Sequence, residues 1–208
     1  MIAILVSTIT FRNMLTYAML LCVMAGVRSC QSKHHDKKWD NAIIDAAISN
    51  NAVYQQLDQE REVSSVLDIQ DTSAKRTSGV AYFTKGHVNL TDSSSARLNN
   101  CRAYFFNRKI LTIDIGIGDG FGGWGFFINY KNGIFYTEPY YSTDVDDPAD
   151  PEPVFNVLYQ KLSLNKATYE PGDSLYGKIE FKSTEIDPDG NEISHHGNGY
   201  FRTVIEER

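Results

Sequence analysis

The stretch Trp124–Tyr141, WGFFINYKNGIFYTEPYY, contains the clearest hairpin signal in the chain. Asn132-Gly133 separates two runs that are rich in aromatic and β-branched residues. Asn-Gly suits both positive-φ positions of a type I′ turn, and a two-residue turn fixes which residues face each other across the hairpin. The turn predicts three cross-strand pairs: Tyr130 with Phe135, Ile128 with Thr137, and Trp124 with Tyr141.

The hairpin has two faces, because successive side chains on a strand point in opposite directions. One face carries large apolar side chains that we predict to be core: Trp124, Phe126, Ile128 and Tyr130. The other face carries the aromatic residues that we predict to face a ligand: Phe127, Tyr136 and Tyr140. Pro139 predicts an edge strand at its position, since proline has no N–H to donate to a neighbour.

The period of two continues on both sides of this hairpin. Before it, one strand face is formed by Leu111, Ile113, Ile115 and Ile117; after it, another is formed by Leu175, Gly177, Ile179 and Phe181. Asn107-Arg108 predicts a turn, and Glu170-Pro171-Gly172-Asp173 predicts a type II turn. The glycine-rich residues 116–125 lack the Lys-Ser/Thr of a phosphate-binding loop, so they predict a bulged bend instead.

Residues 37–60 have a helical rather than a strand pattern. Asp36 is a suitable N-cap, and apolar residues recur at three- and four-residue spacing from Trp39 through Ile43 to Ala46 or Ala47. We therefore predict a helix over 37–60 that packs on the sheet. The fold class expected is mainly β, or α+β, with residues 37–208 as a single domain of sandwich-like antiparallel sheets.

The segment Leu164–Phe181, LNKATYEPGDSLYGKIEF, resembles the opening strand-turn-strand of extracellular immunoglobulin-like sandwiches, including arrestin-like and macroglobulin-like modules. Those modules often carry Tyr-x-Pro-Gly before a strand. The resemblance implies a β-sandwich texture and carries no activity with it.

The N-terminus has the order of a secretion signal over residues 1–29. Met14–Val27 is almost wholly apolar, follows Arg12 and precedes the small residue Ser29. This apolar stretch is shorter than the roughly 20 residues that a membrane-spanning helix needs. We therefore expect export, with Met1 or Met14 as the start.

Val27-Arg28-Ser29-Cys30 resembles the lipobox of bacterial lipoproteins. The resemblance implies a diacylglycerol on Cys30, cleavage before it, a tether over 30–36 and, because Gln31 is not Asp, an outer-membrane address. Arg28 departs from the usual small residue at its position. A plain cut after Ala25 is the alternative; Cys30 could then pair with Cys101, whereas acylation of Cys30 leaves Cys101 free.

The composition and motifs exclude several classes of function. Removing residues 1–29, which hold two arginines and no acid, takes the net charge from −6 to −8, and an acidic protein is a poor partner for nucleic acid. We expect no cofactor and no metal: His34-His35 and His195-His196 are interpreted as solvated loop residues, and Asp187, Asp189 and Asn191 as a turn. Cys101 lies in an apolar strand context and is predicted to be a buried, inert thiol.

These observations favour a non-catalytic cell-envelope lipoprotein that binds or scaffolds, with the membrane as one partner through Cys30. One alternative is an immunity or inhibitor protein that neutralises a toxin through an acidic, partner-facing loop: Asp144, Asp146, Asp147, Asp150 and Glu152. A second alternative is a carbohydrate-binding module that uses the aromatic face, so a protein and a glycan are both expected as possible partners.

Overall fold

The computed structural model describes residues 37–63, 74–85, 97–107, 109–118, 122–143, 153–187 and 189–207. The expected signal over 1–29 and the tether over 30–36, including Cys30, lie outside these residues. Residues from Lys37 onward form one compact unit.

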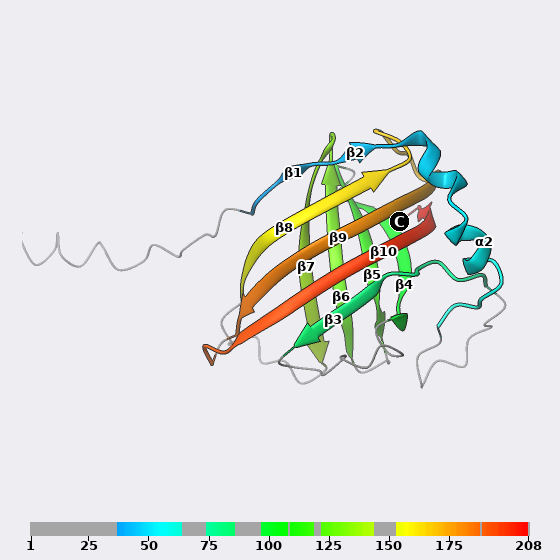
Figure 1. Ribbon diagram of the computed structural model, residues 1–208. Coiled ribbons are helices and arrows are strands. Elements are labelled where there is room, and N and C mark those ends of the chain that lie inside the picture. Colours follow the sequence, from blue (N-terminus) through cyan, green and yellow to red (C-terminus); the bar gives the residue numbers. More distant parts are fainter. Residues whose placement is uncertain are drawn as a thin grey trace, which may run out of the picture. The chain divides into compact units, whose positions relative to one another are not determined.

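The described chain is mainly β, as expected (Figure 1). Its strands are β1 (Asp40–Asn41), β2 (Ile43–Ile44), β3 (Ala81–Lys85), β4 (Asn100–Phe106), β5 (Ile110–Gly118), β6 (Gly122–Lys131), β7 (Ile134–Thr143), β8 (Val154–Leu164), β9 (Ser174–Ile186) and β10 (Glu192–Glu206). Two short helices are present in the described residues, η1 (Ala46–Asn50) and α2 (Val53–Leu57).

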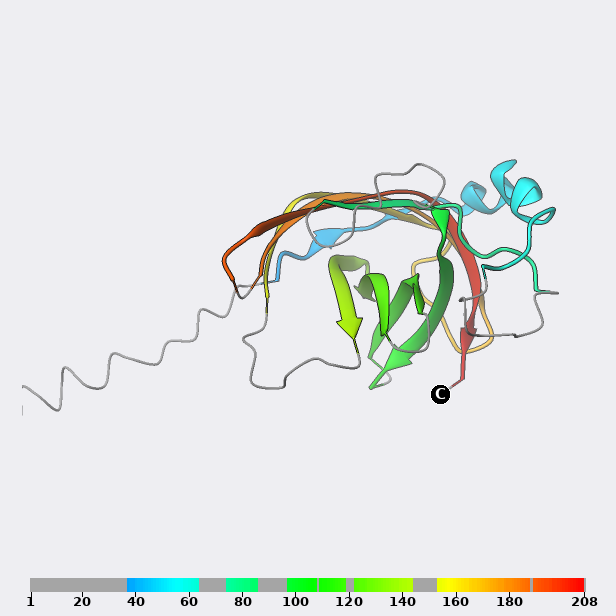
Figure 2. The ribbon, with the colours of Figure 1, turned by 90° about the horizontal axis from the view of Figure 1, so that it is seen from below.

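The strands form one open sheet in the order β1-β7-β6-β5-β4-β10-β9-β8-β2, with β3 paired to β10. We predicted a sandwich-like pair of sheets, but β10 joins the two halves. Its first part pairs with β3 and β9, and its end pairs in parallel with β4, through Ile205 opposite Ala103. Figures 1 and 2 show β8, β9 and β10 as an arched layer that crosses over β4 to β7.

The core lies between these two layers. The ring of Phe126 on β6 is 4.7 Å from that of Phe181 on β9 and 5.2 Å from that of Tyr82 on β3. Most of the predicted core-face residues are buried: Leu111, Ile113, Ile115, Phe126, Ile128, Tyr130, Leu175, Ile179 and Phe181. Ile117, at the end of its predicted face, is only partly buried. Trp124 packs against this cluster while staying partly exposed.

The predicted hairpin is present as β6 and β7. Asn132 and Gly133 have φ values of 52° and 87°, and all three predicted cross-strand pairs occur. The edge prediction for Pro139 is confirmed as well, because β1 pairs with β7 only at Ile134 and Phe135. The turn at Glu170 has the expected positive φ at Gly172, 86°, and the Asp173 N–H donates to the Glu170 carbonyl.

The helix predicted over 37–60 is wrong. The segment instead runs along both free edges of the sheet: β1 pairs with β7, and β2 pairs in parallel with β8. Helix appears only at 46–50, where the Asp45 carboxylate accepts from the Ala47 N–H, and at 53–57. Edge strands offer unpaired backbone groups, and pairing with them outweighs a weak local helix preference.

Gln160 on β8 joins the same edges through its side chain. Its Oε1 accepts from the backbone N–H and the hydroxyl of Thr137 on β7, both at 2.9 Å. Its Nε2 donates to the Lys38 carbonyl and to the Asp40 carboxylate, also at 2.9 Å. One amide thus connects β7, β8 and the N-terminal segment.

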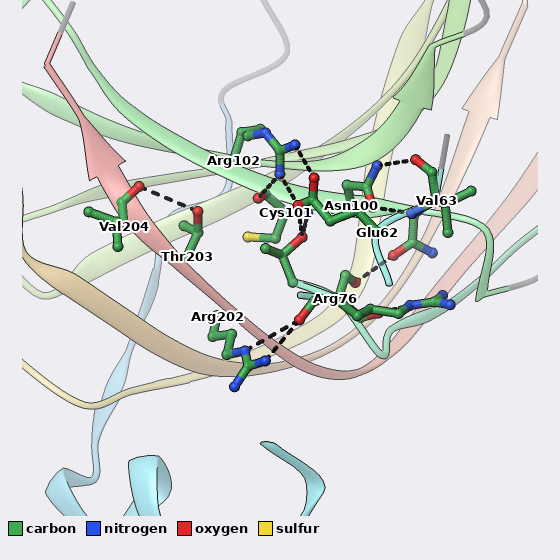
Figure 3. A network of polar contacts seen from close by, with 12 residues as sticks. Glu62, Val63, Arg76, Asn100, Cys101, Arg102, Arg202, Thr203 and Val204 are labelled. Carbon is green, nitrogen blue, oxygen red and sulfur yellow. Dashed lines mark hydrogen bonds and ion pairs between the residues drawn. The ribbon is translucent and has the colours of Figure 1, made fainter. Parts of the chain in front are cut away.

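A second polar network lies at the start of β4 and joins this strand to residues that precede β3 (Figure 3). The Arg102 guanidinium donates to both Glu62 carboxylate oxygens, at 2.6 and 2.7 Å. The Asn100 amide exchanges two hydrogen bonds with the Val63 backbone, and the Thr77 hydroxyl donates to Glu62. Bidentate arginine pairs fix geometry as well as charge, so this network anchors the segment before β3 to β4.

Candidate functional site

A shallow hollow of about 410 Å³ lies on the outer face of the arched layer. It is lined by Ala81 and Phe83 of β3, His196, Gly197 and Asn198 of β10, Phe181 of β9 and Tyr159 of β8. Alternation along each strand explains the arrangement, because Tyr82 and Phe181 fill the core while the side chains beside them in sequence face outward.

Cross-strand pairing places four chemically distinct side chains in one row, of which Phe83, His196 and Tyr159 line the hollow and Lys182 lies next to it. Phe83 lies opposite His196, His196 opposite Lys182, and Lys182 opposite Tyr159. The row therefore has an aromatic ring at each end and two nitrogen-bearing side chains between them. The adjacent row adds Asn198 and Glu180, and the Tyr159 hydroxyl donates to the Glu180 carboxylate at 3.2 Å.

The cation nearest to the hollow is Lys182, which lies opposite His196. Partial burial of the ring, followed by the nearby Lys182 and then His195, lowers the pKa of His196 below its usual value. Glu180 lies opposite Lys161 across the strands. Among the described residues, Lys182 has no carboxylate within ion-pair distance.

Directly behind the hollow, the neighbouring His195 points into the core. Its Nε2 is 2.8 Å from the Glu185 carboxylate, and its Nδ1 is 2.9 Å from the Tyr82 hydroxyl and 3.1 Å from the Thr84 hydroxyl. His195 is 5% exposed. The prediction that both histidines are solvated loop residues is therefore wrong, because both lie within β10; His195 is buried, and only His196 on the opposite face is exposed.

The cluster around His195 has the carboxylate–imidazole–hydroxyl order of an activated nucleophile. An ionised Glu185 carboxylate can only accept a hydrogen bond, so the hydrogen between the two groups is on His195 Nε2. In a neutral His195 ring, Nδ1 then carries no hydrogen and accepts one from a hydroxyl group. However, Tyr82 and Thr84 are 4% and 5% exposed, and the Ser183 hydroxyl beside them is buried with no hydrogen-bond partner among the described residues. Enclosure of the hydroxyl groups makes this cluster a structural support for the sheet.

The aromatic residues predicted to face a ligand lie together on the outer face of the other layer. Phe127 stacks on Tyr140 with ring centroids 4.5 Å apart, and Trp39 meets Tyr136 edge to face, also at 4.5 Å. Lys37 donates to the Tyr136 hydroxyl and to the Glu138 carboxylate. The structure therefore brings Phe127, Tyr136 and Tyr140 onto one face, but their rings largely contact one another and Trp39.

The glycine-rich stretch has a role on this same face. Gly116 and Gly125 lie opposite each other on β5 and β6, and a Cβ at either position would meet the Tyr140 hydroxyl. That hydroxyl donates to the Asp114 carboxylate at 3.0 Å. Gly116 and Gly125 thus make room for a tyrosine within regular strands, and the turn that follows Gly118 lies outside the described residues.

Other predicted site residues have varied outcomes. Cys101 is free and fully buried, and burial raises the pKa of its thiol well above its usual value, as expected of an inert thiol. Asp187 accepts from the Asn191 N–H within a turn, as predicted. Asp144, Asp146, Asp147, Asp150 and Glu152 lie outside the described residues, as do Cys30 and His34-His35.

Two searches over the described part of the chain were negative. No group of three or more His, Cys, Asp or Glu there is arranged to hold a metal ion. No helix within it has the length and apolar character needed to cross a membrane.

Comparisons of the chain with protein-family models, with curated proteins and with solved structures each give no match.

Sequence reasoning missed the hollow and the cluster behind it. A signal for Glu185 was present, because the alternation of Leu175, Gly177, Ile179 and Phe181 continues for two more steps to Ser183 and Glu185. For the hollow no comparable signal exists. Its row joins residues 83, 159, 182 and 196, which only the strand order brings together.

Proposed function

We propose that this chain is a non-catalytic binding protein of the cell envelope, held at the membrane by a lipid on Cys30, and that its ligand binds in the hollow over β3, β10, β9 and β8. One observation carries the proposal. The hollow combines concave shape with aromatic rings at both ends and polar side chains between them, Phe83 and Tyr159 flanking His196. Ligand sites combine apolar walls with a few placed polar groups in this way.

The enclosed state of the His195 cluster supports the non-catalytic part of the proposal. A nucleophile has to reach the substrate atom that it attacks. The hydroxyl groups that His195 contacts are buried between the layers, whereas the side chains that line the hollow form no hydrogen-bonded base–nucleophile pair among the described residues. The hollow is therefore suited to recognition without turnover.

The proposal is tested by titrating the mature protein with a panel of envelope and environmental glycans while amide resonances are recorded. We expect shifts confined to β3, β8, β9 and β10, and recovery of the bound glycan unchanged. Tyr159→Ala is expected to weaken binding about tenfold or more, the cost of truncating a well-packed aromatic contact.

Tyr141→Ala is the matched control, because Tyr141 is also an exposed tyrosine, 51% against 44% for Tyr159, and lies on β7 in the other layer. We expect no change in affinity for this variant. Chemical conversion of a bound glycan, or equal losses in the two variants, would show that the proposal is wrong.

A further inference from the structure

The charges around the hollow differ from those of the whole chain. The chain has a net charge of −6. On the outer face of β8 and β9, by contrast, the four positions 161, 178, 180 and 182 carry three lysines and one acid: Lys161, Lys178, Glu180 and Lys182. Lys161 is opposite Glu180, and the Lys178 ammonium lies over the Tyr200 ring at 5.3 Å from its centroid. Lys182 is the lysine that lies within the aromatic row, between His196 and Tyr159.

The backbone under the middle of the hollow is paired on both sides. β10 hydrogen-bonds to β3 and to β9, and β9 hydrogen-bonds to β10 and to β8. Free edges, at which an extended peptide adds a strand, lie only at the two ends of the row in the described residues: β3 pairs with β10 alone, and β2 pairs with β8 only at Ser163 and Leu164. Over β9 and β10 recognition must therefore come from side chains, by ring stacking, by hydrogen bonds from Asn198 and His196, and by hydrogen bonds that the Tyr159 hydroxyl accepts.

The spacing of the aromatic rings sets the length of the ligand. Phe83 and Tyr159 are separated by three strand-to-strand steps, or roughly 14 Å at about 4.8 Å a step. A ligand that contacts both rings must therefore extend well beyond one small ring. A chain of linked sugar rings has the required length, flat C–H faces for the aromatic rings, and hydroxyl groups for the polar side chains.

We propose that the hollow binds an acidic oligosaccharide, with sugar rings stacked against Phe83 and Tyr159 and a carboxylate paired with the Lys182 ammonium. This assignment rests on the proposed function and specifies its ligand class. No bond is made or broken. The anion supplies a carboxylate partner for the Lys182 ammonium, which has none within ion-pair distance among the described residues.

The test uses the full mature protein in calorimetric titrations with trimers of galacturonic, glucuronic and mannuronic acid, each paired with its methyl ester. The ester keeps the rings and removes the charge. We expect at least one acid to bind and its ester to bind at least tenfold more weakly, and we expect the affinity for the acid to fall as salt is added, because the pair is near the surface.

Variants separate charge recognition from stacking. Lys182→Gln is expected to weaken the acid about tenfold and leave the ester unchanged, whereas Tyr159→Ala weakens both. Lys131→Gln, an exposed lysine at the end of β6 in the other layer, should change neither. Circular dichroism spectra that match the unmodified protein establish that the variants fold.

Three results would overturn the assignment. Equal affinity for an acid and its ester would retain the hollow as a glycan site and remove the acidic specificity. If no acid binds while a neutral member of the wider glycan panel shifts the amides of β3 and β8, the ligand class is wrong but the proposed function stands. If an acidic peptide binds and no acidic trimer does, the hollow recognises protein and the assignment fails.

Discussion

The imidazole of His195 is held from both sides inside the protein. Glu185 accepts from one ring nitrogen, and Tyr82 and Thr84 surround the other. These four residues come from β3, β9 and β10, so the cluster joins the three strands that form the floor of the hollow. A buried polar group without its partner is costly, and each member therefore depends on the others.

Glu185→Ala should lower the free energy of unfolding by about 1–3 kcal/mol, because the His195 Nε2–H would lose its acceptor in a buried setting. Chemical denaturation measures the change. Glu180→Ala makes the same substitution on the outer face of the same strand and is expected to cost less than about 0.5 kcal/mol. Glu185→Gln retains a carbonyl acceptor and should recover part of the loss. Similar costs for Glu180→Ala and Glu185→Ala would contradict the burial of this pair.

Cys101 is the second residue whose surroundings decide its chemistry. Burial raises the pKa of its thiol, so at pH 8 very little reactive thiolate is present, and the sulfur is enclosed. Iodoacetamide at pH 8 should leave the folded mature protein unmodified and should label one thiol after denaturation, as counted by mass spectrometry. Two labelled thiols, or none, would show that Cys30 is not acylated.

At the scale of elements, the N-terminal segment was the least predictable part. Residues 37–60 have a helical spacing of apolar side chains, but β1 and β2 pair with the two free edges of the sheet. No local pattern in 40–44 indicates which distant strands will be edges. By contrast, the β6–β7 hairpin was predictable to the residue, since Asn132-Gly133 determines the register without help from the rest of the chain.

Gln160→Ala should detach this segment from the sheet edges. The substitution removes four hydrogen bonds, including the only side-chain acceptor seen for the Thr137 N–H in the described residues. We expect a loss of about 1–3 kcal/mol and faster hydrogen exchange at Thr137. Lys161→Ala, at the next position and exposed, is the control. Unchanged exchange at Thr137 would mean that the Gln160 amide does not hold the edges together.

At the scale of the whole molecule, the anchor and the hollow belong to one proposed function. The lipobox-like residues predict a mature chain that begins at Cys30 and carries a net charge of −8. Intact-mass measurement of membrane-extracted protein should find the diacylglycerol on Cys30, and Cys30→Ser should release the protein from the membrane fraction. A mature N-terminus at Gly26 would instead support the plain cut after Ala25.

The sequence by itself determined what depends on neighbours in the chain: the alternation that defines the core faces, the positive-φ turns at Asn132-Gly133 and Gly172, and the register of one hairpin. These follow from steric limits on the backbone and from the period of a strand. Tertiary structure alone decided the rest. His195 is buried against Glu185 because β9 continues past Phe181, and Phe83 meets His196 because β3 pairs with a strand more than 100 residues later in the chain. Long-range pairing is selected by how all strands bury their faces together, and no single segment contains that information.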